Sequence, residues 1–180
     1  MRVQSVSPGS IPKYTSLFLA SCSRPLLDAC VSALRAHATL SETAAYVADA
    51  TDTWKLCEDA SHAALSSDEA DVTHVVCVTQ DQFGVVREAT RAFDLASYFG
   101  ALASARATSA ALLPWTPPRS FHFAAGNLIG YARVLKSTQT LLDSHPRMLG
   151  ACPPGTTMFA TQQVQGCLLY TSDAADERSS

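Results

Sequence analysis

The order of elements along the 180-residue chain predicts a three-layer α/β/α fold with a mostly parallel sheet. Short apolar runs alternate with longer stretches whose apolar residues recur at helical spacing, which is typical of β-α-β crossovers. The clearest run is 72–79, VTHVVCVT, which is β-branched and apolar like a buried parallel strand. We therefore expect helices on both faces of the sheet and ligands at the carboxyl ends of its strands.

The individual elements follow from turn residues and periodicity. The expected strands are 16–20, 44–48, 72–79, 109–113 and 147–152, and the expected helices are 25–38, 53–66, 85–106 and 123–142. Pro25 suits the first turn of the first helix, whose Leu27, Cys30 and Leu34 share one face. Pro114 ends the fourth strand, and Pro154 and Gly155 follow the last one.

Composition limits the classes of function. Charged residues make up 16% of the chain, the net charge is −3 and the pI is near 5.9, which is unlike a basic nucleic-acid binder. No apolar run approaches the roughly 20 residues that span a bilayer. We expect a cytoplasmic protein that binds neither nucleic acid nor a membrane. The six cysteines lack CxxC spacing, so they indicate reduced buried thiols and neither a metal site nor a redox pair.

Three segments are expected. Residues 1–15 form a polar leader, and residues 16–166 form a single domain that is incomplete at its C-terminus. Residues 167–180 form a non-native tail, because the string CLLYTSDAADE at 167–177 resembles a translated sequencing-library adapter.

The segment LFLASCSRPLLDACVSALRAHA at 17–38 has a strand, a turn and a helix in succession. With the later strands and the closing PPGTTMF, it resembles the short-chain dehydrogenase/reductase family, from about Ser16 to Phe159. The resemblance implies a Rossmann-like fold that binds NADP or NAD. Ser21, Pro25 and Leu27 stand where the family has three glycines, and Ser23 and Arg24 match its phosphate loop. In the family, a basic residue at the place of Arg24 suits NADP.

The resemblance implies further cofactor contacts. Asp49 and Ala50 open an Asp-Ala-Thr-Asp string that is similar to the family's Asp-Val-Thr-Asp, whose first Asp contacts adenine. The alternative for Asp49 is a helix cap. Thr79 stands within the four positions of the family's Asn-Asn-Ala-Gly, and Pro154 and Gly155 match the turn that holds nicotinamide.

The catalytic positions of the family are substituted. The resemblance places Phe121 at the Tyr position, Ala125 at the Lys position and Ala96 at the structural Asn position. Phe121 has no proton to donate and Ala125 has no charge, so no catalytic group is intact. We expect a degenerate NAD(P)-binding protein without normal carbonyl reductase or alcohol dehydrogenase activity, either through biological loss or through sequence error.

Two alternatives remain. One is a non-catalytic Rossmann scaffold that acts through protein association, and the other is an unrelated α/β domain. In relatives, the helices that correspond to 85–106 and 123–142 form a dimer face. Both stretches carry few charges here, so a homodimer through them is expected. The sequence does not identify which small molecule would be the substrate.

Overall fold

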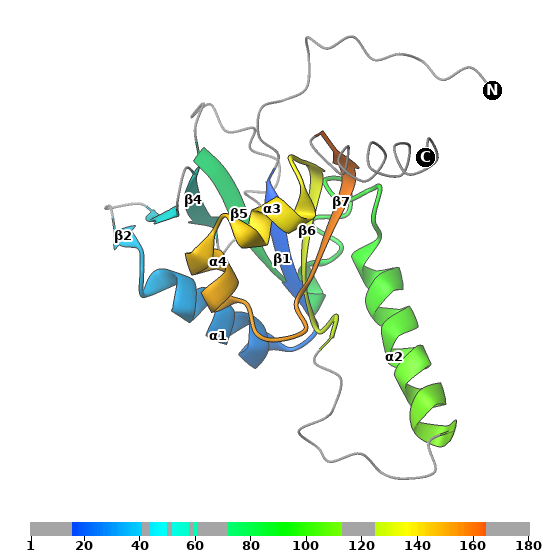
Figure 1. Ribbon diagram of the computed structural model, residues 1–180. Helices are drawn as coiled ribbons and strands as arrows, with labels where there is room; N and C mark the ends of the chain where they lie inside the picture. Colours follow the sequence, from blue (N-terminus) through cyan, green and yellow to red (C-terminus); the bar gives the residue numbers. More distant parts are fainter. Residues whose placement is uncertain are drawn as a thin grey trace, which may run out of the picture.

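The computed structural model describes residues 16–40, 44–49, 52–57, 60, 72–112 and 125–164. Its strands are β1 (Leu17–Ser21), β2 (Thr39–Leu40), β3 (Ala45–Asp49), β4 (Asp52–Cys57), β5 (Val72–Thr79), β6 (Leu128–Leu135) and β7 (Thr157–Gln163). Its helices are α1 (Arg24–Arg35), α2 (Leu95–Leu112), α3 (Thr138–Asp143) and α4 (Pro146–Ala151), with the 3-10 helix η2 at Gln80–Gln82. These residues form an α/β protein with a seven-stranded mixed sheet (Figure 1).

The first half of the predicted order is largely confirmed. The strands expected at 16–20, 44–48 and 72–79 are β1, β3 and β5, and the helix expected at 25–38 is α1. All five residues of β1 are buried, because β1 lies between β5 and β6 in the sheet. Apolar composition and a Pro near the helix start were sufficient signals here.

The strand order is not that of a Rossmann fold. It runs β2-β3-β4-β5-β1-β6-β7, and among the described strands three pairings are parallel and three are antiparallel. The expectation of a mostly parallel sheet is therefore wrong. Part of the reason is that Asp49 pairs with Asp52, so two residues join β3 to β4. Such a short connection can only turn the chain back into an antiparallel strand.

Two expected elements have the wrong type because their period was misjudged. The start of the helix predicted at 53–66 is instead β4, in which Trp54 and Leu56 are buried at the period of two residues that a strand requires. The helix predicted at 123–142 contains β6, whose first five residues are buried, followed by α3.

Three further boundaries differ. The helix expected at 85–106 begins only at Leu95, where the Asp94 carboxylate accepts a hydrogen bond from the Ser97 N–H at 3.1 Å and caps α2. The strand expected at 109–113 falls largely inside the same helix, since its Ala and Leu residues are good helix formers. The strand expected at 147–152 is α4, which starts with Pro146.

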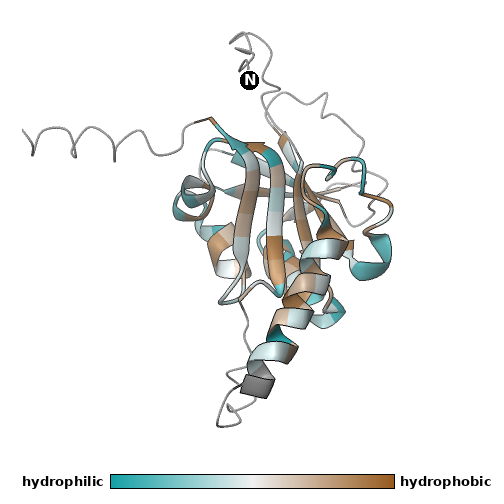
Figure 2. Cartoon of the chain, turned by 90° about the vertical axis from the view of Figure 1, so that its right-hand side faces the viewer, coloured by the Kyte–Doolittle hydropathy of each residue, from teal (hydrophilic) through white to brown (hydrophobic). Residues whose placement is uncertain are grey.

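Helices cover both faces of the sheet, and the two faces have different cores. We call the side packed by α1, α3 and α4 the α1 face; these helices lie in front of the strands in Figure 1. We call the side packed by α2 and residues 83–93 the α2 face. Hydrophobic residues concentrate on the strands between these layers, whereas the turns are more hydrophilic (Figure 2). The polar ends of the strands are therefore the places where a site can form.

The expected dimer face loses one of its two helices, because β6 replaces the helix predicted at 123–142. The homodimer itself stays a prediction and now rests on α2, whose residues 103–105 and 107–109 are exposed. Within the described part of the chain, no helix combines the length and apolar character needed to cross a membrane.

Candidate functional site

The carboxyl ends of β1 and β5 meet at one edge of the sheet. The two strands are parallel neighbours, and Ser21 is paired with Thr79 at their ends. The buried Ser21 hydroxyl donates to the Asn127 carbonyl at 2.7 Å and accepts from the Ser23 N–H at 3.0 Å. These bonds hold the chain in a turn of two residues between β1 and α1.

A pocket of about 310 Å³ opens between α1 and the end of β5. Its α1 wall consists of Arg24, Leu27, Asp28, Val31, Ser32 and Arg35. Their spacing of three and four residues makes them one stripe along the helix. Cys77, Thr79 and Gln82 form the opposite wall. The volume lies at the lower end of the roughly 300–1,000 Å³ that is typical of small-molecule sites.

The two arginines stand at opposite ends of this stripe. Because a helix rises 1.5 Å per residue, Arg24 and Arg35 are about 16 Å apart along the axis of α1. Leu27 and Val31, both largely buried, form an apolar wall between them. The pocket is therefore elongated, with a cation at each end.

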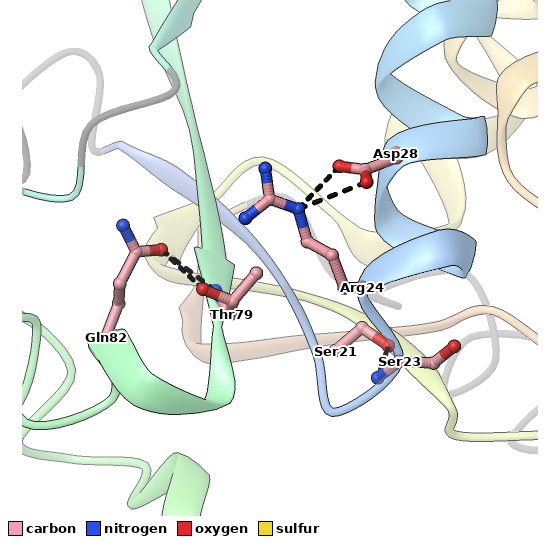
Figure 3. Close-up of polar contacts among 6 residues, drawn as sticks. All are labelled: Ser21, Ser23, Arg24, Asp28, Thr79 and Gln82. Carbon is pink, nitrogen blue, oxygen red and sulfur yellow. Dashed lines mark hydrogen bonds and ion pairs between the residues drawn. The ribbon is translucent and has the colours of Figure 1, made fainter.

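Arg24 is held by an ion pair that can be exchanged. Its Nε donates to both carboxylate oxygens of Asp28, at 2.8 and 3.1 Å, one helical turn along (Figure 3). The two side chains are 72% and 55% exposed. Exposed pairs of this kind contribute about 0–1 kcal/mol, so the guanidinium can accept another anion at small cost.

The polar groups of Thr79 are engaged within the chain. The Oε1 atom of Gln82 accepts from the Thr79 N–H at 3.0 Å and from its hydroxyl at 2.9 Å (Figure 3). Next to it, hydrogen bonding to the Thr79 side chain and to the Asp81 N–H, with a weaker effect of Arg24, keeps the pKa of the Asp81 carboxyl below its ordinary value. Thr79 therefore shapes the wall of the pocket and orders the turn that follows β5.

Most of the residues predicted to hold the cofactor lie at this edge. Ser21, Ser23, Arg24 and Thr79 are brought together by β1, α1 and β5. β6 is antiparallel to β1 and β7 is parallel to β6, so both strands start here. The exposed turn of Pro154 and Gly155 before β7 is joined to Gly126 before β6, whose N–H donates to the Gly155 carbonyl at 2.8 Å.

Asp49 is not brought to this edge. Because β3 is antiparallel to β4, which runs parallel to β5, Asp49 lies at the opposite edge of the sheet from Ser21. Its buried carboxylate accepts the backbone N–H groups of Arg147 at 3.3 Å and Met148 at 2.9 Å. Asp49 thus caps a helix, as the alternative interpretation of this residue predicts. The helix is α4, which is distant in the sequence.

The expected catalytic positions do not gather into a site. Phe121 and Ala50 lie outside the described residues. Ala96 is exposed in the first turn of α2, and Ala125 is exposed in the turn before β6. Because a strand follows Ala125, the helix on which the resemblance places a Tyr and Lys pair is not formed there.

The sequence alone did not single out the polar residues that complete the pocket, namely Asp28, Ser32, Arg35 and Gln82. A signal for three of them was present, because Arg24, Asp28, Ser32 and Arg35 recur at helical spacing on α1. Polar residues in such a row beside the buried Leu27 and Val31 indicate a helix edge that borders a cleft. The position of Gln82 depends on η2, which no spacing reveals.

A second polar cluster lies on the α1 face. The ring of His145 has Nε2 at 2.7 Å from an Asp52 carboxylate oxygen and Nδ1 at 2.8 Å from the Leu141 carbonyl. It also lies edge-on to Trp54, with the ring centres 4.9 Å apart. Since both nitrogens are engaged, the pair joins β4 to α3 and α4 and is not available to a substrate. No group of three metal-ligating side chains occurs among the residues that the structure describes.

Comparison of the chain with protein-family models, with characterised proteins and with solved structures finds no match. The resemblance to the short-chain dehydrogenases and reductases therefore stays a prediction. The function has to be argued from the geometry of the pocket.

Proposed function

We propose that the protein binds a phosphate-bearing small molecule along α1, with NADP as the first candidate and NAD as the second, and that it lacks Ser-Tyr-Lys reductase chemistry. The observation that carries this proposal is the placement of Arg24 and Arg35 at the two ends of one pocket. Guanidinium groups match phosphate oxygens in charge and geometry, because their N–H donors form a planar fork.

The position and shape of the pocket support an elongated ligand. It begins at the carboxyl end of β5, where open α/β sheets commonly bind ligands, and extends along α1 from Arg24 to Arg35. The apolar wall of Leu27 and Val31 suits a ring or a methylene-rich segment between two anionic groups. Asp28 beside Arg24 opposes anions, so binding requires that the Arg24 side chain exchange its partner.

The binding mode differs from that of a glycine-rich phosphate loop. In that loop, the backbone N–H groups face the pyrophosphate and a glycine permits its close approach. Here the turn has two residues, and the Ser23 N–H is already bonded to the Ser21 hydroxyl. We therefore assign the phosphate contacts to the arginine side chains.

A fluorescence titration with NADPH tests the proposal. We expect saturable binding, and we expect Arg24→Gln or Arg35→Gln to weaken it by about tenfold, which corresponds to about 1.4 kcal/mol. The matched control is Arg91→Gln, because Arg91 also forms an exposed ion pair on its own segment, with Glu88 at 3.4 Å, and does not line the pocket. The control should bind NADPH like the parent protein.

Two outcomes contradict the proposal. One is the absence of binding at millimolar NADPH, and the other is an equal effect of the Arg24 and Arg91 variants. NADH provides a further comparison. If Arg24 contacts the 2′-phosphate, as the resemblance implies, the parent protein should bind NADH more weakly than NADPH. The Arg24→Gln variant should bind NADH and NADPH with equal affinity.

A further inference from the structure

Two cysteines that are distant in the sequence meet on the α1 face. Cys30 lies in the middle of α1 and Cys152 directly follows α4. Cys30 belongs to the buried core cluster and Cys152 packs against that cluster where α1 meets α4, and a side-chain hydrogen bond links the two thiols. Cys30 is 1% exposed, Cys152 is partly exposed, and neither forms a disulfide.

We propose that Cys30 and Cys152 form an oxidisable dithiol, which a hydroperoxide converts to an intramolecular disulfide between α1 and the turn that leads to β7. This inference does not rest on the ligand proposed above. It concerns a different pair of groups, and its test uses no nucleotide.

The surroundings assign a role to each sulfur. Cys152 is partly exposed and can be reached by a peroxide, whereas Cys30 is buried behind it. The hydrogen bond from the Cys30 thiol also lowers the pKa of Cys152 below its ordinary value, against the effect of its partial burial. The same hydrogen bond and burial raise the pKa of Cys30. The thiolate is the nucleophilic form of cysteine. Cys152 is therefore the sulfur that reacts first, and Cys30 is the thiol that resolves the product.

The reaction has two steps. The Cys152 thiolate attacks one oxygen of hydrogen peroxide, the O–O bond breaks, and hydroxide leaves, so that Cys152 becomes a sulfenic acid. The Cys30 sulfur then attacks the Cys152 sulfur, the S–O bond breaks, and the hydroxyl group leaves as water with the Cys30 proton. The two thiols lose two electrons in total, and the peroxide gains them.

The other described cysteines are less suited to this reaction. Cys22 is exposed, but partial burial raises the pKa of its thiol. Cys57 is buried with a raised pKa, and its thiol donates to the Lys55 carbonyl at 3.6 Å. Cys77 lies near Cys30 but is 6% exposed, in the wall of the ligand pocket.

The test is peptide mapping of the oxidised full-length chain without reductant. Trypsin releases Cys30 in peptide 14–35, since the bond after Arg24 precedes Pro25, and releases Cys152 in peptide 148–178. These peptides also contain Cys22 and Cys167. The protein is therefore made with Cys22→Ala and Cys167→Ala, treated with hydrogen peroxide, and its remaining thiols are blocked before digestion.

We expect one species in which peptides 14–35 and 148–178 are joined and are together lighter by two hydrogen atoms than the reduced pair. Reductant should separate them. A Cys152 that stays reduced, a Cys152 that accumulates as sulfinic acid, or a Cys30 joined to Cys77 would each overturn the proposal.

A second measurement does not depend on disulfide formation. The rate of alkylation of Cys152 by iodoacetamide should reach half its maximum at a lower pH than that of Cys22, because its pKa is lowered whereas that of Cys22 is raised. Cys30→Ala should move the Cys152 profile to higher pH and leave the Cys22 profile unchanged. If the Cys152 profile does not move in a folded Cys30→Ala variant, the assigned roles are wrong.

Discussion

The two faces of the sheet bury different kinds of side chains. The α2 face is aromatic: the Phe93 ring lies 5.2 Å from that of Tyr131 and 4.9 Å from that of Phe159, and Phe83 stacks on Phe99 at 5.3 Å. The α1 face is mainly aliphatic, and it also holds the buried Asp49 and His145, the two adjacent thiols and the pocket.

The side chains of the α2 face therefore serve mainly to pack the core, whereas the α1 face also carries groups that can bind or react. Ring stacking fills space and gains contact energy, but it offers few groups that bind or react. Smaller side chains on the α1 face leave room for helix ends, carboxylates and thiols. We therefore expect substitutions in the buried aromatic core of the α2 face to change stability alone, and substitutions on the α1 face to change stability or function according to position.

The largest expected effect is on the aromatic side. Phe99→Ala removes a ring that is 8% exposed and contacts Phe83 and Tyr98, so it should lower the free energy of unfolding by about 3–5 kcal/mol. Urea unfolding measures the loss. At a temperature where the variant is folded, its affinity for NADPH should equal that of the parent. A change in affinity would show that the two faces are not independent.

The hydrogen-bonded pair of His145 and Asp52 on the α1 face should come second. His145→Ala leaves the partly exposed Asp52 carboxylate without this partner, and we expect a loss of about 2–3 kcal/mol. Asp52→Ala should cost a similar amount, and the double variant should cost little more than either one. Strictly additive losses in urea unfolding would contradict the coupling that the 2.7 Å contact implies.

A smaller effect is expected at Asp49. Asp49→Ala removes the acceptor for the Met148 and Arg147 N–H groups, so unfolding should become easier by about 1–2 kcal/mol. The affinity for NADPH should not change, because Asp49 lies at the opposite edge from the pocket. A large loss of affinity would favour the adenine contact that the family resemblance implies.

The smallest change in stability is expected at the pocket entrance. Asp28→Asn removes an exposed partner of Arg24 and should alter the free energy of unfolding by less than about 0.5 kcal/mol. The same change should increase the affinity for NADPH, since Arg24 no longer has to exchange a carboxylate. Calorimetric titration measures this effect, and a decrease in affinity would contradict the assigned role of Arg24.

The sequence predicted elements best where the local signal and the tertiary environment agree. β5 was predicted with its observed bounds, because seven of its eight residues are apolar or β-branched and leave few alternatives. The signal failed at β6, where Gly130, Ala132 and Arg133 weaken the strand pattern and the helix α3 follows closely. Burial between β1 and β7 holds that segment as a strand.

The residues of the candidate site show the same contrast between local signals in the sequence and placement by the tertiary structure. Ser21, Ser23, Arg24 and Thr79 were predicted through the family resemblance, whose motifs fall at the ends of strands that are recognisable in the sequence. Arg35 and Gln82 could not be assigned without knowing which side of α1 faces β5 and how η2 turns. Asp49 lies away from the other predicted residues because the direction of β3 depends on the hairpin with β4 and not on the composition of the strand.

The sequence by itself determined that the chain forms an α/β protein, where β1, α1 and β5 lie, and that a basic residue follows the first strand. These properties depend on local periodicity and on residue type. Strand direction, the sharing of one pocket by Arg24 and Arg35, and the meeting of Cys30 with Cys152 were decided only by the tertiary structure. Each depends on contacts between distant segments, because burial of their apolar sides selects one arrangement among many that the local pattern allows.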